Sequence, residues 1–336
     1  MLYVTTRNKK ETYTSFKAVT DDRAPDGGSF VPFKMPFFTT EQIHSLKDTS
    51  FNQVVADVLN AFFASRLSVW DVDLCVGKNP LRLREMNYRV LLAEVWHNPK
   101  GNYAYLEEKL CSRLPGAEQA EHISDWVHTT VRIAVLFGIY GQLCAQGYLK
   151  CGDYLDIAVS GEGFTAPMAC FYARQMGLPI NVILCAFEND SAAWDLIHRG
   201  TFGLSGGAVS LRRGIEKLIS ATLGDGAVDD FCQCVRTPRS YSVNAEQLKT
   251  LSEGFYCVVA GKNRAGATVN SIFRSNAYLV DPATALCYGG LQDYRSATGN
   301  SCITLMISER SPAHDIDFIS NATGIQAEKL LEKMKP

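Results

Sequence analysis

The sequence predicts an α/β protein built on a doubly wound, mixed β-sheet. Two apolar stretches, YLDIAVS at 154–160 and PINVILCAF at 179–187, have the length and composition of buried strands. Between them lie a glycine loop, GEGF at 161–164, and the helix-like segment TAPMACFYARQM, which Gly177 ends. This order is a β-α-β unit with a right-handed crossover. Further apolar runs at 255–261 and 302–308 extend the sheet.

Helices are predicted where apolar residues recur every three or four positions. Residues 50–68 carry such a face, and 126–147 form a strongly apolar helix that ends at Gly147. Two more helices are expected at about 281–295 and 315–334. Before 50–68, Thr39 or Thr40 can cap a short helix.

The order of these elements predicts two parts. Residues 1–90, with the strand-like LYVTT and the turn-rich APDGGSFVP, are expected to form a small N-terminal α+β domain. Residues 91–336 are expected to form the α/β domain. A polar segment at 111–125 interrupts it, and Pro115 and Gly116 break any helix there.

Composition excludes several classes of function. A formal net charge of -2, from 33 Lys and Arg against 35 Asp and Glu, leaves no basic block for nucleic acid. Eleven cysteines without paired spacing indicate reduced thiols rather than a disulfide scaffold, and the six histidines show no metal-ligand spacing. No apolar run predicts a membrane span or a leader, so a cytoplasmic protein is expected.

Four separated stretches carry a recognisable pattern: APDGGSFVP at 24–32, LLAEVWHNPKGNYAY at 91–105, the β-α-β unit continued by FENDSAAWDLIHRGTF to 202, and VDPATALCYGGLQDY at 280–294. Together they resemble the threonine synthase family, whose members are fold type II enzymes that use pyridoxal phosphate (PLP). They occur in the family's order over nearly the whole chain. The resemblance implies the large domain of the tryptophan synthase beta-like fold and an ancestor acting on O-phosphohomoserine.

That chemistry needs a lysine that holds PLP as a Schiff base. Aligning His97, Asn98 and Pro99 with the family's H-G-P puts Ala104 at the lysine position, and an alanine cannot form an imine. Lys100 is the nearest substitute, and His97 is an acid-base candidate in the same segment. The catalytic residue is therefore unknown, with Lys100 and His97 as its candidates.

The resemblance also assigns a remnant anion loop, Ser160, Gly161, Glu162, Gly163, Phe164 and Thr165, between the strand and the helix. Glycines before a helix N-terminus suit an anion, but Glu162 brings a negative charge to the place of the PLP phosphate. Asn189, after the second strand, and Ser308, at the family's position facing the pyridine nitrogen, complete the candidate binding residues.

A further departure lies at the segment 111–125. In the family a second α/β lobe follows the lysine helix, and here the chain continues directly into the apolar helix at 126–147. The resemblance therefore implies that a lobe of on the order of 100 residues is missing, and with it one wall of the usual cleft.

These observations predict a threonine synthase-like protein of amino-acid metabolism that works without PLP, that is, a pseudoenzyme. We expect it to bind a small anionic or amino-acid-like ligand, or a partner protein, which includes a second copy of itself. The alternative is an active PLP lyase on O-phosphohomoserine that uses a displaced lysine. A third interpretation follows from Gly161-x-Gly163-x-x-Ala166 with Glu188, which also fits the fingerprint of a nicotinamide enzyme.

Overall fold

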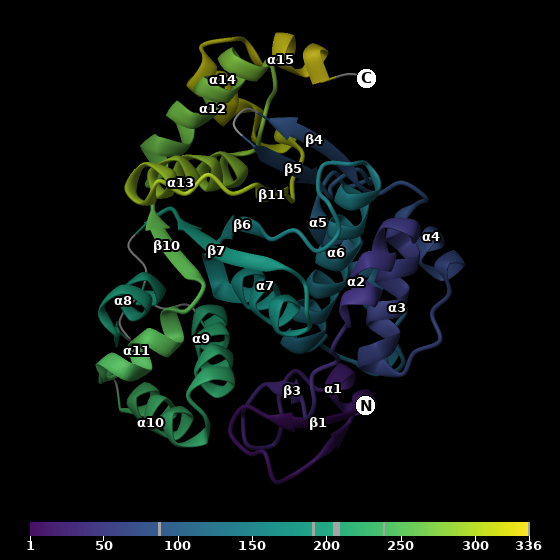
Figure 1. Ribbon diagram of the computed structural model, residues 1–336, viewed down its shortest axis with the longest axis vertical. Coiled ribbons are helices and arrows are strands. Elements are labelled where there is room, and N and C mark those ends of the chain that lie inside the picture. Colours follow the sequence, from purple (N-terminus) through teal and green to yellow (C-terminus); the bar gives the residue numbers. More distant parts are fainter. Residues whose placement is uncertain (87–88, 190–191, 204–208, 238, 335–336) are drawn as a thin grey trace.

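The computed structural model describes residues 1–336 apart from 87–88, 190–191, 204–208, 238 and 335–336. Its centre is a six-stranded sheet with the order β10-β7-β6-β11-β5-β4 (Figure 1). The strands are β4 (Arg82–Met86), β5 (Val90–Glu94), β6 (Leu155–Ser160), β7 (Ile180–Phe187), β10 (Phe255–Val259) and β11 (Thr304–Ser308). All neighbours run parallel except β4, which pairs antiparallel with β5. The predicted mixed sheet is confirmed.

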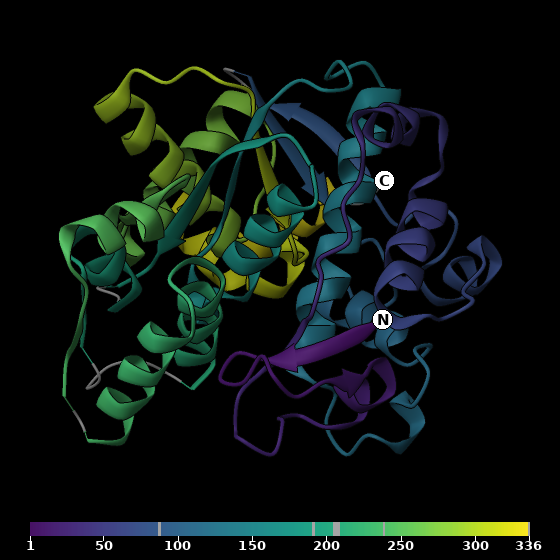
Figure 2. The ribbon, with the colours of Figure 1, turned by 60° about the horizontal axis from the view of Figure 1, so that its bottom comes forward.

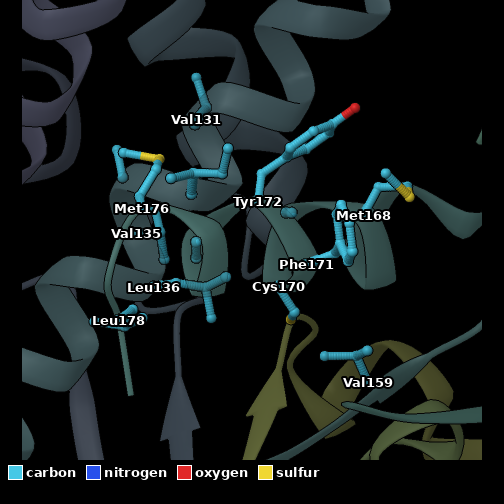
Figure 3. Close-up of a cluster of buried hydrophobic side chains, with 14 of the residues drawn as sticks. Val131, Val135, Leu136, Val159, Met168, Cys170, Phe171, Tyr172, Met176 and Leu178 are labelled. Atoms are coloured by element: carbon cyan, nitrogen blue, oxygen red, sulfur yellow. The ribbon is translucent and has the colours of Figure 1, made fainter. Parts of the chain in front are cut away.

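Helices cover both faces of this sheet. On one face α7 (Thr165–Gln175) packs on β6 and β7, and α6 (Asp125–Ala145) packs on α7. Figure 3 shows this layer, with Val131, Val135 and Leu136 of α6 facing α7, and with Cys170 of α7 pointing toward Val159 of β6. On the other face α12 (Lys262–Asn276) and α13 (Pro282–Thr298) enclose a second apolar core (Figure 1). The fold is therefore doubly wound.

The N-terminal region forms a separate small sheet of β1 (Leu2–Thr5), β2 (Tyr13–Thr14) and β3 (Phe30–Pro32). Its helices are α1 (Ser15–Thr20), α2 (Thr40–Ser45), α3 (Phe51–Phe63) and α4 (Val69–Val76). Figure 2 brings this region to the front, with α3 beside the long α6. Arg7 joins it to α9 (Val209–Thr222) through an ion pair of 2.9 Å with Glu216.

The remaining elements complete the molecule at its two ends. They are α5 (Tyr103–Cys111), α8 (Ala192–Arg199), β8 (Thr201–Phe202), α9 (Val209–Thr222), α10 (Asp225–Arg236), β9 (Tyr241–Ser242), α11 (Ala245–Ser252), α14 (Ile316–Thr323) and α15 (Ala327–Met334), with 3-10 turns η1 (Leu46–Asp48), η2 (Ala117–Gln119), η3 (Glu162–Phe164) and η4 (Pro312–Asp315).

Most predicted helices are confirmed, and local chemistry sets their ends. The Ser50 side chain accepts a hydrogen bond from the Gln53 amide and starts α3, and Asp281 caps α13 in the same way. The predicted helix at 315–334 is wrong as a single helix. Gly324, at a φ of 72°, ends α14, and α15 follows as a separate helix.

Helix α6 corrects a second expectation. By length and composition Asp125–Ala145 is apolar enough to cross a membrane, although the sequence interpretation found no such run. In the folded chain 83% of its most apolar window is buried, against α3, α5 and α7. A core helix of a doubly wound fold needs an apolar surface on nearly every side, which explains this composition.

Candidate functional site

A cavity of about 600 Å³ opens beyond the carboxyl ends of three parallel strands, where ligands gather in open α/β sheets. Ser160 ends β6, Glu188 follows β7, and Glu309 follows β11. The lining residues are Asn102, Tyr103, Ala104, Glu107, Arg132, Val159, Ser160, Glu162, Glu188, Ala265, Asp281, Pro282, Ala283, Thr284, Leu286, Cys287, Ile307, Glu309, Arg310, Asp315 and Phe318. We call this space the main cavity.

The main cavity is acidic. Among the described residues its lining holds six carboxylates and two arginines, Arg132 and Arg310, and no lysine. Arg310 lies 3.4 Å from Asp315. Glu162 and Glu188 form no ion pair and no side-chain hydrogen bond within the described part of the chain, so their charges face the cavity without a protein partner.

Arg132 holds the wall of the cavity together. It reaches across from the middle of α6 to form ion pairs with Glu309 and, at 3.6 Å, with Glu107. Its guanidinium lies 4.4 Å from the centre of the Tyr103 ring. Burial opposes the charge of Arg132, but the neighbouring carboxylates outweigh it and raise the pKa. The sequence interpretation did not select Arg132, although one arginine inside a strongly apolar helix is a detectable signal.

Asp281 forms another part of the lining and is 3% exposed. It accepts hydrogen bonds from the amides of Ala283 and Thr284 and from the hydroxyls of Thr284 and Ser308. Burial raises its pKa, against the effect of these hydrogen bonds. Ser308 is itself buried and also accepts from the Trp96 indole at 3.1 Å. It therefore does not line the cavity.

The predicted anion loop contributes only two of its six residues to the lining, Ser160 and Glu162. Gly161 lies against the Phe187 ring, where an added Cβ would approach within 2.3 Å. Phe164, at a φ of 59°, turns inward and stacks on Phe255. Gly163 and Thr165 do not line the cavity. Asn189 is exposed and also lies outside it.

The amides of this loop are largely occupied. The Gly161 amide donates to Ala186, the Glu162 amide to the Ser160 hydroxyl, and the Phe164 amide to Gly161. In the first turn of α7, Pro167 has no N–H to offer. Few donors therefore remain for an anion at this helix start.

A second hollow, of about 770 Å³, lies on the other side of the segment 97–104 and is open to solvent. Its lining residues are Arg82, Trp96, His97, Asn98, Pro99, Lys100, Gly101, Ser311 and His314. We call it the basic hollow. Lys100 is exposed here, in a turn before α5, so it does not share a helical face with Ala104.

His97 is fixed in the basic hollow by a buried carboxylate. Its Nε2 lies 2.5 Å from Glu94, which also accepts a hydrogen bond from Tyr278. Burial opposes the ionisation of Glu94, but the contacts with His97 and Tyr278 prevail and lower its pKa. The two catalytic candidates, His97 and Lys100, thus lie together but apart from Ala104 and the anion loop.

Backbone pairing separates the two spaces. Asn102 and Arg310 form a bridge, the Tyr103 amide donates to the Glu309 carbonyl at 2.6 Å, and the Ser311 amide donates to Gly101 at 2.8 Å. Ala104 follows directly on the side of the main cavity, which it lines as an exposed residue. The position that the alignment gave to the lysine therefore faces the main cavity.

Comparison with known proteins shows what the chain is similar to. Residues 2–78 match the family model described as threonine synthase N terminus. Over 174 residues the chain is 22% identical to threonine synthase-like 1 of Homo sapiens and of Pongo abelii, a match covering 48% of this chain and 23% of theirs. The chain is threonine synthase-like. The match spans less than a quarter of the length of those relatives.

Solved structures show the same fold for this threonine synthase-like chain. PLP-bound threonine synthase from Brucella melitensis superposes with a TM-score of 0.83 at 17% identity, over 97% of this chain and 92% of that one. Threonine synthase from yeast superposes with a TM-score of 0.80 at 15% identity, over 98% and 91%. The resemblance inferred from four short stretches is confirmed.

Proposed function

We propose that this threonine synthase-like chain binds a small ligand in the main cavity and does not carry out PLP-dependent lyase chemistry. One observation carries the proposal. Ala104 lines the cavity at the position of the Schiff-base lysine, and no described lysine lines it with Ala104. The cavity volume lies within the range of small-molecule sites, so the loss of the lysine leaves a binding space.

The residues present do not fit PLP. A phosphate at the loop would meet the unpaired carboxylate of Glu162, and the inward Phe164 and Pro167 reduce the amide donors that the helix start can offer. The attraction of a helix terminus for an anion is about 0.3–1 kcal/mol, which a nearby like charge cancels. A role for PLP is therefore not part of the proposal.

An active lyase that recruits another lysine is less well supported. Lys100 lies in the basic hollow, beyond the bridge between Asn102 and Arg310. Lys217 is fully buried but is held by Asp125 and, at 3.3 Å, by Thr129, and it does not line the main cavity. Neither amine reaches the place that Ala104 occupies.

A nicotinamide enzyme is supported less still. It would need Glu188 to face the cavity and Glu162 to point away, yet both line it.

We also propose that the second lobe of the family is missing, because only the short segment 112–124 joins α5 to α6. A role in amino-acid metabolism also belongs to the proposal, on the ground of the resemblance. A protein partner and a cytoplasmic location are further parts of it.

Titration of the purified chain with PLP tests the negative half of the proposal. We expect no absorbance band of a lysine-bound cofactor, and no single modified lysine when borohydride-treated protein is mapped by mass spectrometry. A saturable band fixed to one lysine, with turnover of O-phosphohomoserine, would restore the lyase.

A thermal-shift screen of small metabolites of mixed charge tests the positive half. Binding to the folded state raises stability by about 2.7 kcal/mol at a ligand concentration a hundred times the Kd, which is a measurable change. The matched variant Ala104→Trp fills the mouth of the cavity from an exposed position. A ligand of the cavity stabilises the wild-type chain and not this variant, whereas equal shifts in both proteins contradict the proposal.

A further inference from the structure

The charge of the main cavity identifies the class of ligand. Among its described lining residues, carboxylates outnumber arginines by six to two. Both arginines are already engaged, Arg132 by Glu107 and Glu309, and Arg310 by Asp315. The lining therefore keeps an excess of negative charge that no described protein group neutralises, which raises the local concentration of cations and repels anions.

The carboxylates are too dispersed for a metal ion. Among the described residues no group of three or more His, Cys, Asp or Glu side chains lies close enough to hold one. Ca²⁺ and Mg²⁺ take six or more oxygen ligands at short distance, and Zn²⁺ takes about four ligands. An organic ammonium ion instead donates single charge-assisted hydrogen bonds to separate carboxylates.

The rest of the lining is suited to an aliphatic body. Val159, Leu286, Ile307 and Phe318 form apolar parts of the same wall. Tyr103, which is 3% exposed, also lines the cavity, and its buried hydroxyl has no hydrogen-bond partner in the described structure. A buried hydroxyl without a partner costs free energy unless a ligand or a water meets it.

We infer that the main cavity binds a small aliphatic amine of net positive charge, with its ammonium group at Glu162 and Glu188. This inference rests on the proposed function and names its ligand class. It excludes phosphorylated and dicarboxylate ligands, which the same carboxylates repel. Glu162 and Glu188 are the two lining carboxylates outside the ion pairs and the helix cap, so they remain free to bind the ligand.

Isothermal titration calorimetry with four probes of equal chain length tests the inference on the full chain. The probes are 1,4-diaminobutane, n-butylamine, 1,4-butanediol and succinate. We expect the diamine to bind most tightly, n-butylamine next, and the diol and succinate at least roughly tenfold more weakly than the diamine. Affinity for the diamine should fall as ionic strength rises, because salt screens the carboxylates.

Two variants locate the effect. Glu162→Gln with Glu188→Gln removes the free charges at nearly constant shape and should weaken diamine binding by roughly tenfold or more. The matched control, Glu118→Gln with Glu121→Gln, removes two exposed charges outside the cavity and should leave the Kd within about twofold. Ala104→Trp should abolish binding of every probe that enters the cavity.

The outcomes separate this inference from the proposed function. Tighter binding of succinate or the diol, abolished by Ala104→Trp, would overturn the inference and leave a ligand-binding cavity. The inference would also be overturned if the control pair, Glu118→Gln with Glu121→Gln, weakened diamine binding as much as the cavity pair does. The carboxylates would then act only through the overall charge of the protein. Failure of all four probes, together with no hit in the thermal-shift screen, would overturn both.

Discussion

The main cavity and the basic hollow lie on opposite sides of one short backbone bridge, yet their charges are opposite. The main cavity has six carboxylates in its described lining, and the basic hollow has Arg82, Lys100 and two histidines with no carboxylate. The family's lysine segment runs between them, from His97 to Ala104. One short backbone segment can thus separate two spaces whose side chains carry opposite charge.

Residues that are close in the lysine segment can lie in different spaces. Lys100 and Ala104 are four residues apart, but the turn at Gly101, with a φ of 61°, and the bridge at Asn102 direct them to different spaces. A lysine near the lost position therefore cannot replace it without a change of backbone.

The largest effect on stability is expected at the wall of the main cavity. Arg132→Met leaves Glu309 without its cation and leaves Glu107 with only its contact of 3.0 Å to His128, in a lining that is already acidic. The Arg132 and Glu107 side chains are 20% and 14% exposed, so their pair is partly buried, and removing the cation should cost roughly 2–3 kcal/mol. Urea unfolding followed by tryptophan fluorescence measures the loss.

Arg310→Met is the matched control in the same cavity. Its side chain is 52% exposed and its contact with Asp315 is 3.4 Å, so the free energy of unfolding should change by less than about 1 kcal/mol. Equal losses in the two variants would contradict the view that Arg132 neutralises the wall.

In the basic hollow, Glu94→Gln should cost about 2 kcal/mol, because it breaks the contacts of a 4% exposed carboxylate with His97 and Tyr278. The pKa of Glu94 is lower in the folded chain than in the unfolded one. Its stabilisation is therefore complete above about pH 4.3 and is lost as the pH falls through the folded value.

The stability difference between wild type and Glu94→Gln should accordingly shrink in urea titrations performed below about pH 4.3. Glu85→Gln, an exposed residue of the neighbouring strand β4, serves as the control and should show little change. A difference that grows on acidification would contradict the assigned direction of the pKa shift.

Much of the fold was predictable because its signals are local. The β-α-β unit at 154–187 has apolar strands, a glycine loop and a glycine stop in sequence order, and α3 and α6 begin at serine caps. The break at Gly324 was also a local signal, but the apolar residues on both sides were interpreted as one continuous helix.

The site was less predictable because it depends on side-chain direction across distant segments. Ala104, Ser160 and Glu162 all line the main cavity although they come from different segments. Arg132 and Glu309 are 177 residues apart, and nothing in either local sequence predicts their ion pair. Phe164 and Asn189 match loop positions of the family, but neither lines the cavity. Phe164 turns inward and packs against Phe255, and Asn189 is exposed to solvent.

A smaller effect concerns the affinity for PLP. Ala104→Lys returns an amine to the main cavity, but the charge of Glu162 still opposes the phosphate. Ala104→Lys with Glu162→Asn should bind PLP roughly tenfold more tightly than Ala104→Lys alone, a difference of about 1.4 kcal/mol. Absorbance titration measures both Kd values, and equal values would show that Glu162 does not limit the site.

The smallest effect is expected for Lys100→Ala. Lys100 is exposed, and its hydrogen bonds within the described structure are made by its backbone: the carbonyl pairs with His314 and Asn102, and the amide donates to Asn98. Stability should stay within about 0.5 kcal/mol of wild type, because a surface substitution away from any cap or buried pair changes little.

Lys100→Ala also tests whether the main cavity and the basic hollow are functionally separate. Thermal shifts produced by ligands of the main cavity should be the same in this variant as in wild type, whereas Ala104→Trp should remove them. If Lys100→Ala weakened those ligands as strongly as Ala104→Trp does, the bridge between Asn102 and Arg310 would not isolate the basic hollow, and Lys100 would return as a residue of the same site.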